Sequence, residues 1–451
     1  MCERFGFYWR ALLNRSKEKR KIQENFLTFV VFSLNLSSGD FYAVRGAADC
    51  GSKRTIQFDV IMGQPKKRRL FTVKNIKRFI LRSWKAERAP MFDVIDFFCG
   101  CGGTSEGLKQ AGMNILLGLD FDKDALQTFA RNHPDAQVIN RDIREVSVDD
   151  LLRLIPGLAK KRRKRPLLFS ACAPCQPFSK QNRQKSSDDQ RISLLSECER
   201  FVVALEPDYI LIENVPGIRS TSADEGPLDR FLSQLKALRY QEPVVQVLKA
   251  ERFGVPQLRR RLIVMVAKNG RAVNELSETH GPGKENLVTV RDTIAKYPSL
   301  EAGQTDAIDA LHRAASVSPL NLKRLRATPV NGGRLDWNAD LRLSCHSKPG
   351  HTDVYGRMNW DRPAPTLTTR CVSVSNGRFA HPEQDRGISL REAAALQTFP
   401  EDFQFAGAMI SIAKQIGNAV PPLLAKKIGE NFTRHYREQN GKNKRRPKTK
   451  R

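Results

Sequence analysis

The sequence predicts an α/β protein with a doubly wound parallel sheet and a smaller, irregular second region. Short apolar runs alternate with helical stretches from Phe92 to about residue 270. A glycine-rich turn follows the first run, as in nucleotide-binding βαβ units. Two later runs lead directly to Cys175 and Glu213. Because open α/β sheets bind ligands outside the carboxyl ends of their strands, these features predict one crevice at that edge.

The charge distribution divides the chain into a body and two basic ends. The chain has 451 residues and a net charge of +28, and this length suggests two or three domains. Residues 1–90 hold 20 basic and 7 acidic residues, and residues 434–451 hold 9 and 1. Basic ends suit a polyanion such as nucleic acid, and solvated tails without a partner are the alternative.

Cysteine usage and hydropathy indicate a cytoplasmic protein. The nine cysteines are scattered unlike a disulfide framework, which favours a reducing compartment. No apolar run reaches the ~20 residues that a membrane span needs. The apolar stretch 26–36 follows basic residues and mimics a secretory signal, but the cysteines argue against export. We expect residues 1–90 to be a poorly ordered basic extension, and Met91, directly before the first strong strand, to be the natural start.

The first βαβ unit carries a candidate nucleotide site. A strand is expected over residues 92–98, a turn over 99–103, a helix to about residue 111 and a strand over 114–119. Thr104 is the expected cap of that helix. Asp120 follows the turn by about twenty residues, where an acid can accept from ribose hydroxyls. Asp142 follows another short strand, and a cap for the helix expected from Ser147 onward is the simpler interpretation of Asp142 alone.

Cys175 has the position expected of a nucleophile. It follows a buried strand, residues 166–172, and lies between Pro174 and Pro177. Proline fixes its own φ and restricts the residue before it, so the thiol is held in place at the crevice. A thiolate placed there is suited to covalent catalysis. The alternative is a proline-rich turn with a core cysteine.

Glu213 supplies a candidate acid at the same edge of the sheet. It ends the strand that begins at Asp208 and precedes a proline turn, although a simple turn acid is possible. A strand pair is expected over residues 244–248 and 262–267. Between these strands, Arg259 and Arg261 alternate, so both are expected on one face.

The remainder of the chain is less regular until its last helices. Residues 271–385 contain few periodic runs and many possible DNA contacts. A zinc site at Cys345, His346 and His351 does not fit standard spacing. Ser389 and Glu392 form an expected capping box, and residues 416–421 open a last helix to about residue 436. The possible DNA contacts are Lys323, Arg324, Arg326, Arg334, Arg342, His346, Lys348, His351, Arg357 and Trp360.

Several of these motifs together resemble the cytosine-5 DNA methyltransferases of bacterial restriction–modification systems. The resemblance covers roughly residues 92–435. It is carried, in order, by Asp96-x-Phe98-x-Gly100-x-Gly102-Gly103, Pro174-Cys175-Gln176, Glu213-Asn214-Val215, Gln257-x-Arg259-x-Arg261, residues 362–369 and Gly417-Asn418-Ala419-Val420.

The resemblance implies a fold, a reaction and a set of site residues. The fold is a Rossmann-like methyltransferase domain (residues 91–270) with a target-recognition domain (271–385), a C-terminal return (386–436) and a disordered basic tail (437–451). The reaction is methyl transfer from S-adenosylmethionine, without a metal, to C5 of a flipped-out cytosine in a specific double-stranded DNA sequence. A monomer is expected, with a cognate restriction endonuclease as functional partner. The implied catalytic residues are Cys175, Glu213, Arg259 and Arg261, and the implied cofactor-binding residues are Phe98, Gly100, Gly102, Gly103, Asp120, Asp142, Pro174, Leu194, Asn418 and Val420.

Three other functions stay open at this point. Cys99, Cys101, Cys172 and Cys175 could hold a metal or cycle as redox thiols, but this hypothesis leaves Glu213 and the arginines unexplained. An inactive DNA-binding relative and an enzyme that methylates transfer RNA are the other two.

Overall fold

The computed structural model describes residues 91–173, 194–219, 226–342 and 353–443, together with three short strands nearer the N-terminus. The chain divides into two units, residues 1–89 and 90–451. In the first unit, β1 (Leu34–Asn35), β2 (Phe41–Ala47) and β3 (Gln57–Ile61) form an antiparallel sheet in that order.

The second unit is built on a seven-stranded sheet with the order β6-β5-β4-β7-β8-β10-β9. The first five strands are parallel, and β10 pairs antiparallel with both β8 and β9. The α/β prediction and the expected strand pair are therefore confirmed. The strands are β4 (Asp93–Phe97), β5 (Asn114–Asp120), β6 (Gln137–Asn140), β7 (Leu167–Ala171), β8 (Tyr209–Asn214), β9 (Val244–Lys249) and β10 (Arg260–Ala267).

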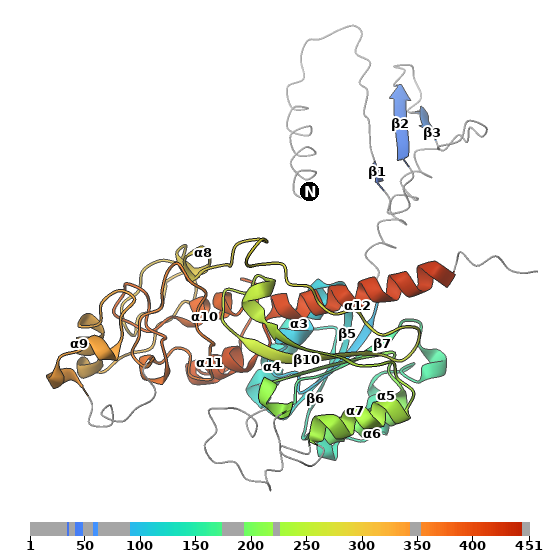
Figure 1. Ribbon diagram of the computed structural model, residues 1–451, viewed down its shortest axis with the longest axis horizontal. Coiled ribbons are helices and arrows are strands. Elements are labelled where there is room, and N and C mark those ends of the chain that lie inside the picture. The colour runs from blue at the N-terminus through green and yellow to red at the C-terminus, as the bar shows by residue number, and fades with distance from the viewer. Residues whose placement is uncertain are drawn as a thin grey trace, which may run out of the picture. The chain divides into compact units, whose positions relative to one another are not determined.

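Helices cover both faces of this sheet (Figure 1). On one face lie α5 (Val148–Leu154), α6 (Leu194–Leu205) and α7 (Pro227–Ala237). On the other lie α3 (Gly103–Gln110), α4 (Lys123–Asn132) and α12 (Pro422–Asn443).

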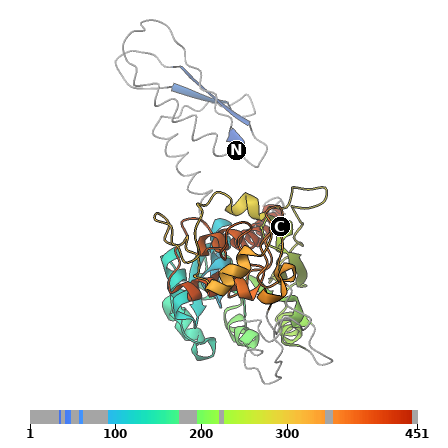
Figure 2. The same cartoon turned by 90° about the vertical axis from the view of Figure 1, so that its left-hand side faces the viewer.

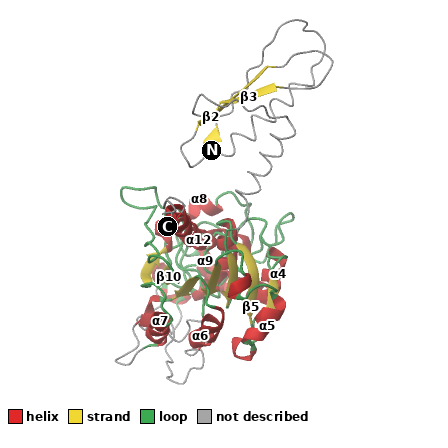
Figure 3. Cartoon of the chain, turned by 90° about the vertical axis from the view of Figure 1, so that its right-hand side faces the viewer, coloured by secondary structure: helices red, strands yellow, loops and turns green. Residues whose placement is uncertain are grey.

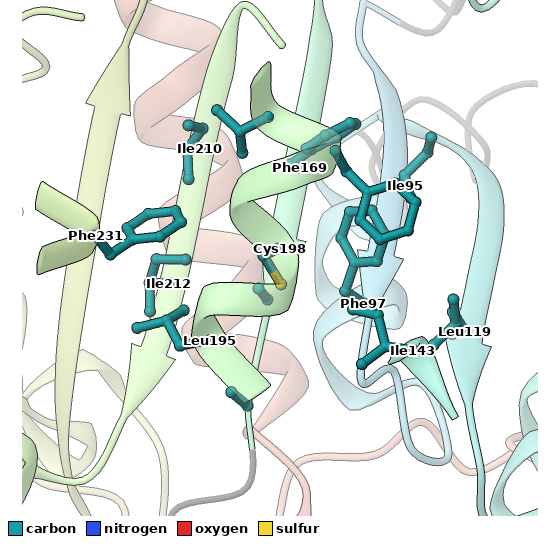
Figure 4. Close-up of a cluster of buried hydrophobic side chains, with 14 of the residues drawn as sticks. Ile95, Phe97, Leu119, Ile143, Phe169, Leu195, Cys198, Ile210, Ile212 and Phe231 are labelled. Carbon is teal, nitrogen blue, oxygen red and sulfur yellow. The ribbon is translucent and has the colours of Figure 1, made fainter. Parts of the chain in front are cut away.

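Alternation along the strands builds the two cores. Ile95 and Phe97 of β4 face α6, where the Phe97 and Phe169 rings meet edge to face at 5.1 Å between centroids (Figure 4). Val94 faces the opposite side, toward the helix α12. Because side chains alternate between the faces of a strand, the apolar residues of this short strand supply both cores.

The C-terminal helix α12 returns to the start of the unit and packs on α3. Leu424, Ile428 and Phe432 follow a spacing of four residues and are buried, which gives the helix one apolar face. A Cβ on Gly107 of α3 would lie 2.2 Å from the Pro422 carbonyl oxygen. The two helices therefore approach closely, and both ends of this unit share one core.

The smaller region is mainly loops and short helices, as Figures 2 and 3 show. Buried arginines support it. Arg357 donates to the carbonyls of Leu325, Thr328 and His381 at 2.8–3.1 Å. Because loops lack sheet partners, a guanidinium with five donors can satisfy carbonyls from several segments. Its helices are α8 (Val290–Ile294) and α9 (Pro319–Arg326). The C-terminal return adds α10 (Leu390–Leu396) and α11 (Met409–Asn418), which share one core with α8.

Two details of the helices differ from expectation, and a third agrees. Thr104 is not a cap, because α3 starts at Gly103 and its N-cap is Gly102 with a φ of 93°. The expected last helix is two helices, since residues 416–418 end α11 and α12 starts at Pro422. The capping box of Ser389 and Glu392 is confirmed. Of the helices in the described ranges, none has the length and apolar character of a membrane span.

Candidate active site

The turn after β4 creates a backbone cradle. Phe98, Gly100 and Gly102 have φ values of 59°, 52° and 93°, so three residues adopt the left-handed conformation. Glycine enters this region freely, whereas phenylalanine does so at a cost that is common at functional sites. A Cβ on Gly100 would meet nothing within 4 Å. The turn therefore leaves room beside its backbone.

Asp120 holds this turn in place. At the end of β5, Oδ2 of Asp120 accepts from the Gly100 N–H at 2.8 Å and Oδ1 accepts from the Asp122 N–H at 2.9 Å. Burial raises the pKa of the Asp120 carboxyl above its ordinary value, and the backbone donors oppose this shift. The acid thus fixes the glycine turn as well as facing the crevice.

Asp142 sits at the start of a 3-10 helix, Ile143–Glu145, and caps it. Its Oδ1 and Oδ2 accept from Nε and Nη2 of Arg144 at 2.9 and 2.6 Å. These hydrogen bonds lower the pKa of the Asp142 carboxyl, which keeps it ionised at neutral pH. Asp142 therefore caps this short 3-10 helix and not the helix expected from Ser147 onward, which Ser147 itself caps. Its side chain also lines the crevice described next.

A cavity of about 460 Å³ opens at the carboxyl ends of the strands. Its wall brings together residues from the turn after β4, from β5, β8, β10, α3 and α6, and from the C-terminal return. Gly102 is not part of this wall, since it serves as the cap behind the turn. Pro174 and Cys175 lie outside the described residues. The predicted site residues on the wall are Phe98, Gly100, Gly103, Asp120, Asp142, Leu194, Glu213, Arg261, Asn418 and Val420.

Glu213 and Arg261 form an ion pair at one end of this cavity. The Arg261 Nε lies 2.7 Å from Glu213 Oε1, and both side chains are largely buried. The antiparallel pairing of β8 with β10 makes this contact possible, because Glu213 lies opposite Ile263, two residues from Arg261. A carboxylate and a guanidinium are therefore held side by side facing the crevice.

Arg259 has a different environment from Arg261. It lies before β10, is 1% exposed, and donates to the carbonyls of Leu367 and Gly417 at 3.2–3.3 Å. It does not line the cavity. Buried and exposed positions alternate from Gln257 to Arg261, so both arginines lie on one side of the chain. Arg259 precedes β10, however, and only Arg261 reaches the cavity.

Several predicted DNA contacts in the smaller region are core residues instead. Arg324, Arg334 and Arg357 are at most 5% exposed, and Trp360 is 9% exposed. Arg324 donates to the Leu341 carbonyl at 3.0 Å. Arg324 and Arg357 thus donate to backbone carbonyls, and Trp360 Nε1 donates to Glu383 Oε1 at 2.8 Å. Because these side chains are buried in the protein's own core, they are not the DNA contacts that the composition suggested. Lys323 and Arg326 are exposed, Arg342 is also exposed, and Cys345, His346, Lys348 and His351 lie outside the described residues.

The cysteines near the cavity are held as protonated thiols. Burial raises the pKa of Cys101 to about 12 and raises the pKa values of Cys99 and Cys172 well above the usual range. Such thiols stay protonated at neutral pH, and the thiolate is the form that binds metals or attacks disulfides. Across the described parts of the chain, no group of His, Cys, Asp or Glu converges to hold a metal ion.

The structure adds site residues that the sequence reasoning missed. Phe121 lines the cavity and is 66% exposed, although it is a large apolar side chain. Its neighbour Asp122 pairs with Lys414 of α11 at 2.7 Å. The position of Phe121 directly after Asp120 was the available signal, because an aromatic face at a nucleotide site offers stacking area.

Comparisons with known proteins agree with this geometry. The type II methylase M.HgiDII of Herpetosiphon aurantiacus is 38% identical over 348 residues, covering 76% of this chain and 95% of that protein. The type II methyltransferase M1.HphI of Haemophilus parahaemolyticus is 34% identical over 338 residues, covering 74% and 85%.

Solved structures show the same fold. A prophage-encoded Escherichia coli protein, described as a DNA modification methyltransferase, superposes with a TM-score of 0.53 at 23% identity, covering 76% of this chain and 99% of that chain. The sequence model of C-5 cytosine-specific DNA methylases matches residues 92–434. This chain therefore belongs to the C-5 cytosine-specific DNA methylase family.

Proposed function

We propose that this DNA cytosine-5 methyltransferase modifies a flipped-out cytosine within one short double-stranded DNA sequence, with Cys175 as nucleophile and Glu213 as acid. The observation that carries the proposal is the Glu213–Arg261 ion pair on the wall of the cavity that the glycine turn and Asp120 also line. One crevice thus combines a cofactor-sized space with groups suited to activating a base.

The cavity fits S-adenosylmethionine. Gly100 offers open space beside its backbone, Asp120 and Asp142 present carboxylates, and Phe98 and Phe121 present aromatic surface. Carboxylates can accept from ribose hydroxyls and from an amino group, while aromatic faces can cover a purine. When bound, S-adenosylmethionine supplies an electrophilic methyl group. Leu194, Asn418 and Val420 complete the wall around it.

The protein's task is to make cytosine C5 nucleophilic. The Cys175 thiolate forms a bond to C6, and its electron pair moves the C5–C6 π electrons toward C5. For this step Glu213 carries a proton on Oε2, the oxygen that does not contact Arg261, and donates it to N3, so that negative charge does not build up on the ring. After C5 is methylated, a base removes the C5 proton, the C6–S bond breaks and Cys175 leaves with the electron pair. Glu213 recovers its proton.

Arg261 positions Glu213 for this role. Its Nε lies 2.7 Å from Oε1 of Glu213 and pairs with that oxygen, which leaves Oε2 to face the base. A planar guanidinium fixes a carboxylate better than an ammonium does. Arg259 acts differently in our proposal, because its contacts are backbone carbonyls behind the site.

The base must leave the duplex to reach this crevice, since C6 and N3 are both engaged. By analogy with the type II relatives, we propose that methylation protects DNA from a cognate restriction endonuclease. We also propose that the enzyme acts in the cytoplasm as a monomer.

Two cysteine variants test the nucleophile. Cys175→Ser should bind S-adenosylmethionine and DNA but transfer no labelled methyl group. Cys172→Ser is the matched control, because the Cys172 thiol lies 3.3 Å from Thr104 Oγ1 and its pKa is raised by burial. Methyl transfer retained by Cys175→Ser, or lost only in Cys172→Ser, would contradict the assignment.

A further inference from the structure

Four segments that are distant in sequence meet at a buried polar cluster behind the active site. The cluster consists of the side chains of Gln257, Arg259 and Gln397, and each is at most 1% exposed. Gln257 and Arg259 precede β10, and Gln397 directly follows α10. Buried polar groups must keep their hydrogen bonds, so the cluster fixes the positions of its partners.

One side of the cluster holds an anchor of the recognition region. The Leu367 N–H donates to Gln257 Oε1 at 3.0 Å, and the Leu367 carbonyl accepts from Arg259 Nη1 at 3.2 Å. Nearby, the Leu258 N–H donates to the Ala364 carbonyl at 2.8 Å. Both the N–H and the carbonyl of Leu367 are therefore hydrogen-bonded to the cluster.

The other side of the cluster holds the cavity wall. Gln397 Nε2 donates to the Ala419 carbonyl at 2.5 Å, and Arg259 donates to the Gly417 carbonyl. Residues 418–420 line the cavity. A Cβ on Gly417 would lie 2.0 Å from the Thr368 carbonyl oxygen, so the anchor and the wall also touch directly.

The two glutamines connect these sides. Gln257 Nε2 donates to Gln397 Oε1, which completes a path from Leu367 through Gln257 and Gln397 to Ala419. We call this path the amide relay. In each glutamine, the side-chain oxygen accepts a hydrogen bond from the side of the recognition region, and the side-chain N–H donates toward the cavity wall. A shift at Leu367 therefore leaves a buried group unpaired unless the wall at Ala419 adjusts.

We propose that Gln397 is a positioning residue that couples DNA binding at the recognition region to cofactor binding at the cavity wall. This proposal rests on the proposed function. Binding linkage is reciprocal, so DNA and cofactor should change each other's affinity by the same factor.

The test measures the dissociation constant of S-adenosylhomocysteine, which cannot react, by calorimetry. Each protein is titrated without DNA and with a saturating short duplex that carries the sequence the enzyme methylates. The ratio of the two dissociation constants, without and with DNA, measures the coupling. For the wild type this ratio should lie within the usual range for coupled sites, about 5- to 150-fold. Gln397→Met keeps the side-chain volume but removes the hydrogen bonds, and its ratio should fall to about one.

Two further variants make the result specific. Gln257→Met breaks the relay at its other amide and should also bring the ratio to about one, even if Gln397→Met fails to fold. Asn431→Leu is the matched control: Asn431 is a buried amide of α12 that donates to the Asn274 carbonyl at 2.8 Å, and its loss should leave the ratio intact.

The outcomes separate the two proposals. Relay variants with weaker binding but an unchanged ratio would mean a merely structural role and would overturn the inference. If the wild type methylated DNA but showed a ratio of one, the inference would be overturned as well, while the proposed function would stand. A wild type that neither binds S-adenosylhomocysteine nor methylates DNA would instead contradict the proposed function.

Discussion

At the scale of single residues, two arginines separated by one position do different work. Arg261 pairs with Glu213 across neighbouring strands, and Arg259 ties together carbonyls that follow it by 108 and 158 positions. The sequence pattern could place Glu213 and Arg261 at one edge of the sheet, because strand ends and pairing are local signals. It could not place Arg259, since its partners depend on how distant loops pack.

Glu213→Gln tests the acid. The amide keeps the shape of the side chain but cannot deliver a proton to N3, so we expect kcat to fall by about 10²- to 10⁴-fold, the usual contribution of general acid catalysis. Calorimetry should find cofactor affinity little changed. Glu206→Gln is the control, because Glu206 pairs with Lys160 and Lys268 outside the cavity. Equal losses of activity in both variants would contradict the assignment.

Asp96 makes part of the stability depend on pH. It is fully buried, its Oδ2 accepts from Ser105 Oγ at 2.6 Å, and burial raises its pKa from 3.8 to about 6. The folded state therefore binds this proton more tightly than the unfolded state does. The contribution of this proton to the free energy of unfolding is complete below about pH 3.8 and is lost as the pH rises through about 6. Its magnitude is about 3 kcal/mol.

Asp96→Asn should remove this dependence while its amide oxygen still accepts from Ser105. We expect the Tm of the variant, relative to wild type, to increase from pH 4 to pH 7 in thermal melts. A Tm difference that stays constant over this range would show that Asp96 is not protonated preferentially in the fold.

At the scale of elements, glycines decide how the two ends of the chain meet. The short helix α3 carries Gly103 and Gly107 toward the residues that precede and open α12, and a Cβ on Gly103 would lie 2.5 Å from the Val420 carbonyl oxygen. The glycine turn was predictable from its spacing. The helix α11 was not, because its N-cap is Ala408, which provides no side-chain capping bond as a start signal.

Gly107→Ala tests this packing. Its Cβ would lie 2.2 Å from the Pro422 oxygen and 2.5 Å from Ala425 Cβ. We expect a loss of about 2 kcal/mol or more in the free energy of unfolding, because the overlap outweighs the helix propensity that alanine gains. Denaturant titration measures this loss, and cofactor affinity should fall with it.

Gly112→Ala is the comparison. Gly112 has a φ of 83°, and a Cβ there would meet nothing within 4 Å, so only backbone strain of about 1–2 kcal/mol applies. Its cofactor affinity should stay unchanged. If Gly107→Ala kept wild-type affinity and stability, the close approach of α3 and α12 would not matter to the cavity.

At the scale of the whole molecule, the family match from residue 92 to 434 coincides with the unit 90–451. The sequence predicted this unit because its strands, turns and acids recur in a recognisable order. The core of the smaller region was not predictable in the same way. A region so rich in arginine has the composition of a DNA-binding surface. Only the tertiary structure shows that Arg324 and Arg357 donate to buried carbonyls instead.

A protein comprising residues 91–451 should fold with an unchanged Tm and retain methyl transfer. The basic residues 1–90 could still add non-specific phosphate contacts, so the full chain should bind DNA more tightly at low salt and equally at high salt. Calorimetric melts and salt-dependent binding assays measure both effects. A large drop in Tm on removal of residues 1–90 would show that the two units depend on each other.

The most direct test of the central claim is methyl transfer from labelled S-adenosylmethionine to unmethylated double-stranded DNA, with the modified base identified by mass spectrometry and mapped by sequencing. We predict label on C5 of cytosine at one short, recurring sequence. Label on another base, or label on transfer RNA and none on DNA, would contradict the account.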